Sequence, residues 1–168
     1  MLVLKLQPTK RAKRYLDRTN LDAKAIETVL NFFIQPFSQS RKLRFLVLHL
    51  DIDCRRMSSE CVFGANLIVL TGIHTVPRRR DSLSAHTVYI FHHLMHEFRH
   101  FIQDVIFKKT YKDITYDLKD VKEETMAYVD NKLEIDANKF ERYATKKALR
   151  IYKLLLESRV PDSVKFNW

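Results

Sequence analysis

The sequence Met95-His-Glu-Phe-Arg-His-Phe-Ile102 contains the motif His-Glu-x-x-His at residues 96–100. On a helix, His96 and His100 lie one turn apart on the same face, so both imidazoles can bind one metal ion. Glu97, beside the first histidine, is then positioned to accept a proton from a water molecule at the open position of the ion. The motif therefore predicts a hydrolytic metal centre carried by a helix.

The residues around the motif have the pattern of a helix in the protein core. At about 100° per residue, one broad arc is apolar and contains Leu94, Met95, Phe98, Phe101, Ile102, Val105 and Ile106. The opposite arc contains His92, His93, His96, Glu97, His100, Gln103 and Asp104. No lysine occurs between Asp81 and Phe107, although solvated helix faces are normally rich in lysine and glutamate. The histidine-rich composition of this polar arc predicts a functional site that faces a cleft. The alternative is an ordinary amphipathic helix that happens to carry two histidines.

Length and composition are those of one globular domain. The chain has 168 residues, of which 46% are hydrophobic and 30% charged, and we expect a single domain over residues 1–168. The sequence contains no apolar run of 18 residues, which is the pattern that would predict a membrane span, and its first residues lack the apolar region of a signal peptide. Cys54 and Cys61 match no metal-finger spacing and are expected to be reduced thiols. Together these features favour a cytoplasmic protein.

The order of elements predicts an α+β fold with a small mixed sheet. The chain is expected to begin with a basic segment of about 1–20, in which 10–18 form at most one or two helical turns, followed by a helix that is capped by Asn20 and stops before Pro36. Next come a sheet-interior strand over 43–52 and a second β segment over 61–71 that is interrupted at 64–66. The remaining elements are a site helix from Ser82 or Ser84 to about Phe107, a short helix over 123–129, a helix over 133–157 and a tail of about 159–168.

The net charge of +10 is concentrated at the two ends of the chain. Residues 1–20 contain six Lys or Arg and one Asp, and residues 139–168 contain eight Lys or Arg and three acidic residues. The residues between them sum to zero. Such ends can attract nucleic acid without sequence specificity, although the more common outcome is a solvated, soluble surface.

A catalytic zinc site normally has three protein ligands and one open position. No histidine follows His100, which excludes the downstream third histidine of the metzincins and of the SprT-like DNA-repair proteases. The third ligand is therefore expected to be a carboxylate, and the candidates are Glu123, Glu124, Glu134 and Asp136.

The motif followed by Glu134-Ile-Asp-Ala-Asn-Lys-Phe140 resembles the small gluzincin metallopeptidases of the ImmA/IrrE type. More distantly, Glu-x-x-Ala-Asn is similar to a step in the CAAX-processing membrane peptidases. The resemblance implies a zincin-like fold, one Zn²⁺ per chain, Glu134 as third ligand, and Asn138 as the residue that holds His96 or His100, with Asp136 as a further supporting residue. Phe98 and Arg99 stand where the family commonly has small residues.

These features predict a zinc-dependent metallopeptidase in which Glu97 is the general base and a peptide or protein is the substrate. Tyr128 and Tyr143 are candidates for stabilising the oxyanion. Two alternatives stay open. One is a catalytically silent zincin-fold module that binds nucleic acid or a protein partner through its basic ends, and the other is a hydrolase that acts on a bond other than a peptide.

Overall fold

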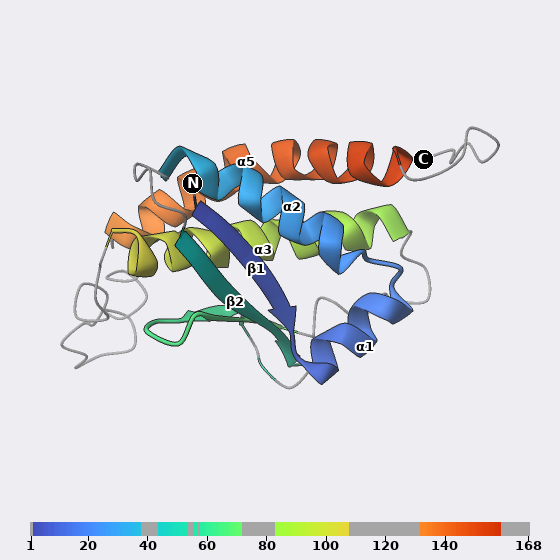
Figure 1. Cartoon of the computed structure of the whole chain (residues 1–168), viewed down its shortest axis with the longest axis horizontal. Helices are drawn as coiled ribbons and strands as arrows, with labels where there is room; N and C mark the ends of the chain where they lie inside the picture. Colours follow the sequence, from blue (N-terminus) through green and yellow to red (C-terminus); the bar gives the residue numbers. More distant parts are fainter. Residues whose placement is uncertain are drawn as a thin grey trace, which may run out of the picture.

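The computed structural model describes residues 2–37, 44–53, 56, 58–71, 83–107 and 132–158. Within these residues the fold is α+β, with four α-helices and one mixed sheet (Figure 1). The helices are α1 (Lys10–Arg18), α2 (Ala23–Ile34), α3 (Leu83–Val105) and α5 (Lys132–Glu157), and a 3₁₀ turn, η1, spans Gln35–Phe37. The strands are β1 (Leu2–Pro8), β2 (Arg44–Asp53), β3 (Glu60–Val62) and β4 (Leu67–Thr71).

The sheet has the strand order β1-β2-β4-β3. Strand β2 pairs in parallel with β1, where Leu4 lies opposite Leu46, and in parallel with β4, where Leu50 lies opposite Ile68. Strands β3 and β4 form an antiparallel hairpin. Every second residue of β1 and β2 points into the core, and the buried set is Leu2, Leu4, Leu6, Leu48, Leu50 and Ile52. The opposite face is open enough to leave Phe45 70% exposed.

Helix α3 is the central element of the core. It contacts β3 and β4 on one side and α5 on the other. Most of its apolar arc is enclosed: Ile90, Phe91, Leu94, Met95, Phe98, Phe101 and Ile102 are each at most 1% exposed, and Val105 and Ile106 are partly buried. Burying side chains of this size stabilises the fold by about 1.5–3 kcal/mol each. The motif helix is therefore rigidly placed between the sheet and the last helix.

Side chains of α2 cover the outer edge of β1. Asn31 accepts a hydrogen bond from Leu4 N–H at 2.8 Å and donates one to Leu4 C=O at 2.7 Å. Glu27 accepts from Leu6 N–H, and Gln35 donates to Leu2 C=O. These bonds occupy the backbone groups that an edge strand otherwise presents to a passing chain.

The hairpin of β3 and β4 turns at residues 63–66, where the sequence predicts a bulge or tight turn. Gly64 has φ +77° and Asn66 has φ 50°, so both lie in the left-handed region. A side chain at Gly64 would meet open space, so backbone conformation rather than room favours glycine there. The Gly64 N–H also donates to Asp104 on α3, which fixes the hairpin against the site helix.

The structure confirms the strand predicted over 43–52, which in the described residues is β2 at Arg44–Asp53, together with the interrupted β segment and the two long helices, and it corrects three predictions. Strand β1 was not predicted. Residues 10–18 form a nine-residue helix, because Thr9 caps its start by accepting a hydrogen bond from Ala12 N–H. The cap of α2 is Asp22 and not Asn20, which instead adopts a left-handed conformation. The predicted helix over 123–129 and the tail lie outside the described residues.

Asp51, near the end of β2, joins α1 to the sheet. Its carboxylate accepts hydrogen bonds from Thr9 Oγ1 at 2.5 Å and from Arg11, which also pairs with Asp53 at 3.4 Å. Burial raises the pKa of Asp51, but hydrogen bonds from Arg11, Thr9 and Ile52 N–H outweigh it and hold the pKa below its usual value. The ionised form of Asp51 therefore stabilises the fold.

We predict that Asp51→Asn lowers the free energy of unfolding at pH 7 by about 1–2 kcal/mol, since Arg11 is half exposed and its contribution is screened. Because the pKa of Asp51 is depressed in the folded state, this stabilisation is present above about pH 4 and is lost as the pH falls through the folded pKa. Urea titrations at pH 7 and at decreasing pH measure the difference, which should shrink on acidification. A difference that grows at low pH contradicts this role.

Candidate metal centre

The two motif histidines and Glu134 converge between α3 and α5. The Nε2 atoms of His96 and His100 lie 3.2 Å apart. The carboxylate of Glu134 lies 3.3 Å from His96 Nε2 and 3.2 Å from His100 Nε2. Among the described residues, these three side chains form the group of histidine and carboxylate donors that could hold a metal ion.

The distances within this group match the coordination shell of a small ion. Donor atoms about 2.0–2.1 Å from a tetrahedral zinc ion lie about 3.3–3.4 Å from one another. In this protein the two Nε2 atoms lie 3.2 Å apart, His96 Nε2 lies 3.3 Å from one oxygen of Glu134, and His100 Nε2 lies 3.2 Å from the other oxygen. Two imidazole nitrogens and one carboxylate are also the donor types of a catalytic zinc site. The three side chains are therefore close enough together to hold a zinc ion.

Gln103 determines which nitrogen of His100 can bind a metal. Its amide group donates to Leu133 C=O at 3.0 Å and to Asp136 at 2.8 Å, and both of these partners can only accept. The amide oxygen must therefore face His100 Nδ1, 2.8 Å away, and accept a hydrogen bond from it. Because Nδ1 carries the proton, Nε2 has a lone pair directed at the candidate metal position.

A carboxylate also lies near the other ring nitrogen of His96. Its Nδ1 lies 3.4 Å from Glu141, and the other oxygen of Glu141 lies 2.8 Å from His92 Nε2. Glu141 is only 8% exposed. When a metal replaces the proton on Nε2, a carboxylate in this place favours a proton on Nδ1 and makes the imidazole a stronger ligand.

The electrostatic field of the site favours a cation. Glu97, Glu134 and Glu141 are 7%, 4% and 8% exposed, and buried carboxylates are costly unless a positive charge compensates them. Burial lowers the pKa of His96. The hydrogen bond with Glu134 and the charges of Glu97, Glu134 and Glu141 raise it by more than burial lowers it, so the net shift of the pKa is upward. A proton or a metal ion can supply the positive charge, and the convergent donors favour a metal.

Arg99 joins the site helix to the ligand helix. Its guanidinium binds Asp136 through two hydrogen bonds of 2.7 and 3.1 Å. It also lies 5.2–5.6 Å from the centres of three aromatic rings, those of Phe37, Phe107 and Phe140. The two large residues between the histidines therefore both have a structural place. Phe98 is buried in the core, and Arg99 holds α5 through Asp136, which is two residues from Glu134.

Glu97 lies beside the donors in a nearly closed environment. Burial raises its pKa to about 7, although the positive field of His96 and His100 and a hydrogen bond from the backbone of Cys61 act in the opposite direction. A carboxyl group with a pKa near neutrality can both accept and donate a proton. Cys61 itself is a free thiol whose pKa is raised by burial, and it does not belong to the group of convergent donors.

Several of the other predicted site residues lie elsewhere. Asp136 binds Arg99 and Gln103, so it supports the ligands rather than joining them. Asn138 is exposed, and the groups next to the Nδ1 atoms of the histidines are Gln103, which is hydrogen-bonded to His100, and Glu141, which lies 3.4 Å from His96. Tyr143 is 63% exposed and follows Glu134 by two and a half turns, which places it on the opposite side of α5. It is therefore not an oxyanion stabiliser. Tyr128, Glu123 and Glu124 lie outside the described residues.

The sequence interpretation missed the roles of Gln103, Glu141 and His92. Each is spaced so that it shares a helix face with a ligand. Gln103 follows His100 by three residues, Glu141 follows Glu134 by seven, and His92 precedes His96 by four. This spacing could have identified them as candidates, but only the register between α3 and α5 shows which atoms meet.

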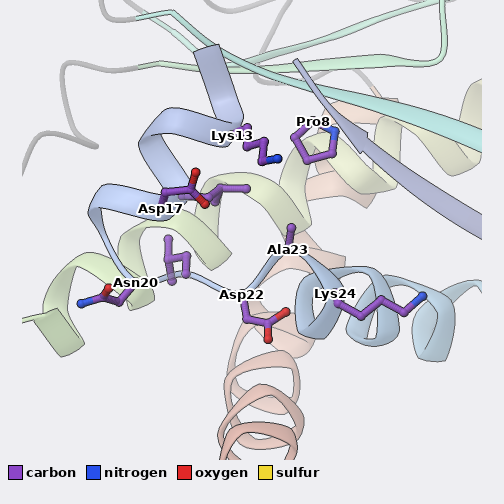
Figure 2. A pocket seen from close by; sticks show the side chains of 9 residues that line it. Pro8, Lys13, Asp17, Asn20, Asp22, Ala23 and Lys24 are labelled. Carbon is purple, nitrogen blue, oxygen red and sulfur yellow. The ribbon is translucent and has the colours of Figure 1, made fainter. Parts of the chain in front are cut away.

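A hollow in the described surface lies far from this cluster. A pocket of about 650 Å³ opens between α1 and α2 (Figure 2) and is lined by Pro8, Lys13, Leu16, Asp17, Asn20, Leu21, Asp22, Ala23 and Lys24. Asp22 N–H donates to the hydroxyl of Tyr152, which lies about 27 Å along α5 from Glu134. The donor chemistry, and not this hollow, therefore marks the candidate centre.

No protein-family model, curated protein or solved structure matches the chain. None of the described helices combines the length and the hydropathy that a membrane crossing requires. The function of the centre therefore has to be inferred from the chemistry of its own residues.

We predict that the purified protein binds about one Zn²⁺ per chain, and that His100→Ala or Glu134→Gln weakens zinc binding by more than about 100-fold. Loss of a ligand should weaken the affinity by more than loss of a residue that only orients a ligand. Elemental analysis and competition with a chelator measure both quantities. His49→Ala is the matched control, because His49 lies on β2 outside the cluster. Unchanged zinc content after loss of Glu134 would move the third ligand elsewhere, and full content without both motif histidines would exclude the centre.

We also predict that Gln103→Leu weakens zinc binding by about 10–100-fold, because His100 loses the acceptor that keeps Nδ1 protonated. The substitution removes hydrogen bonds but keeps most of the side-chain volume. Chelator competition gives the zinc affinity, and circular dichroism verifies that the variant is folded. Equal zinc affinity in a folded Gln103→Leu protein would show that Gln103 does not orient the ligand.

Proposed function

We propose that this protein is a zinc-dependent metallopeptidase with a zincin-like fold, in which His96, His100 and Glu134 hold the metal and Glu97 is the general base. The observation that supports it most is the convergence of three metal donors at 3.2–3.3 Å, beside a buried carboxylate with a pKa near 7. The order of sheet, site helix and ligand helix agrees with the fold that the motif implies.

A zinc ion held by these side chains would supply Lewis acidity, which polarises the scissile carbonyl and makes the attacking water more acidic. Glu97 then removes a proton from that water as its oxygen bonds to the carbonyl carbon. The same carboxyl group donates the proton to the amide nitrogen, and the carbon–nitrogen bond breaks to give an acid and an amine. Burial of Glu97 supports both transfers, since its pKa allows either protonation state near neutral pH.

The sheet offers an edge on which an extended peptide could bind next to Glu97. Strand β3 is the outermost strand on the side of β4, and no described strand pairs with its outer edge. Its residue Cys61 is hydrogen-bonded through the backbone to Glu97. A substrate strand added to β3 would therefore run past the general base.

We predict that Glu97→Gln retains zinc and folding but lowers peptide hydrolysis by at least about 100-fold, since the amide cannot act as a base. A quenched-fluorescence peptide library gives the activity, and elemental analysis gives the zinc content. Glu157→Gln is the matched control, because Glu157 is exposed at the opposite end of α5 from Glu134. We expect this control to keep full activity.

Activity that survives Glu97→Gln would exclude this mechanism. A wild-type protein that binds zinc but cleaves no member of a broad library would instead favour the silent binding module. Cleavage of a non-peptide ester or amide alone would favour a hydrolase of another class.

A further inference from the structure

The outer face of α5 carries an uninterrupted row of positive charge. Six of its seven exposed basic residues form this row, namely Lys132, Lys139, Arg142, Lys146, Arg150 and Lys153. At about 100° per residue they fall within about 80° of one another on the helix circumference, and they extend about 32 Å along its axis. We refer to these six residues as the basic ridge.

The acidic residues of α5 do not neutralise this ridge. Glu134 and Glu141 point inward to the metal centre and are almost fully buried. Asp136 pairs with Arg99 of α3. Glu157 meets only the last lysine of the ridge, at 3.7 Å from Lys153. The ridge is therefore opposed by a single exposed carboxylate at its end, Glu157, while Glu134 and Glu141 face inward and Asp136 is paired with Arg99.

Two exposed aromatic rings lie beside the middle of the ridge. Tyr143 of α5 is 63% exposed and Phe32 of α2 is 45% exposed. The ammonium group of Lys147 lies 4.7 Å from the centre of the Phe32 ring and 5.7 Å from that of Tyr143, and it donates to the Tyr143 hydroxyl at 3.3 Å. Lys147 thus joins the two rings into one aromatic platform next to the row of cations.

We propose that the basic ridge and this platform bind single-stranded nucleic acid. A linear row of cations suits the phosphates of one strand, and exposed aromatic rings suit stacking by unpaired bases. A lipid surface fits less well, because membrane-bound helices insert an apolar face, whereas the apolar face of α5 is buried in the core. A duplex hides the faces of its bases and would leave the platform unused.

The other basic segment does not form an equivalent surface. Helix α1 lies on the opposite side of the molecule from α5 in Figure 1. It is only nine residues long, and its Arg11 is already paired with Asp51 and Asp53. The binding surface is therefore assigned to α5 alone, and net charge by itself does not create it.

Fluorescence anisotropy of the full-length protein with a labelled 20-nucleotide single strand of mixed sequence tests the proposal. Neutralising four to six phosphates predicts that log K falls with log salt with a slope of about −3 to −4. Lys146→Glu with Arg150→Glu should weaken binding more than about tenfold at 0.1 M salt and reduce the slope by about 1–2. Lys10→Glu with Arg14→Glu on α1 makes the same charge change and should weaken binding less than about threefold.

Tyr143→Ala should weaken binding by about tenfold, whereas Tyr143→Phe, which keeps the ring, should bind within about twofold of wild type. Glu97→Gln should bind as wild type does, because the ridge is independent of the metal centre. Equal losses in the α5 and α1 double variants would overturn the proposal, as would tighter binding of the matching duplex. It would also be overturned by binding to phosphatidylserine vesicles without binding to the oligonucleotide, or by no binding at 50 mM salt.

Discussion

Three electron-rich groups meet at one point in this protein, and that convergence constrains the structure around it. Gln103 keeps the Nδ1 proton of His100, Glu141 lies near Nδ1 of His96, and the Nε2 atoms of both histidines face the carboxylate of Glu134. Groups of this kind repel one another at 3.2–3.3 Å unless a positive charge lies between them. The protein maintains the arrangement by packing α3 firmly into the core and by holding α5 against it through Arg99 and Asp136.

Helix α5 serves two purposes because its two sides are chemically separate. Its inner side supplies Glu134 and Glu141 to the centre, and small residues such as Ala137 and Ala144 allow a close approach to α3. Its outer side is free to carry lysine and arginine. A helix of 26 residues is long enough for both patterns, since each needs only every third or fourth position.

Much of this fold follows from local patterns in the sequence. The periodicity around residues 94–106 predicted the buried face of α3, and the run 43–52 predicted the strand that lies inside the sheet. Strand β1 escaped prediction although Lys5 and Gln7 alternate with its leucines, because the segment is short and its partner β2 lies about 40 residues further along the chain. Similarly, the motif named His96 and His100, but the supporting roles of Gln103 and Glu141 depend on the register between two helices. Tyr143 was misplaced because residue type alone does not show which side of a helix faces the site.

The hydrogen bonds from α2 to β1 give the sheet two unlike ends. At one end, Glu27, Asn31 and Gln35 already occupy the backbone groups, and at the other, within the described part of the chain, β3 has no neighbouring strand. A fibre built by strand addition needs two open edges on every molecule. Two copies joined through β3 would use up their open edges on each other, in a self-complementary pair. Growth by edge pairing would therefore stop at a dimer.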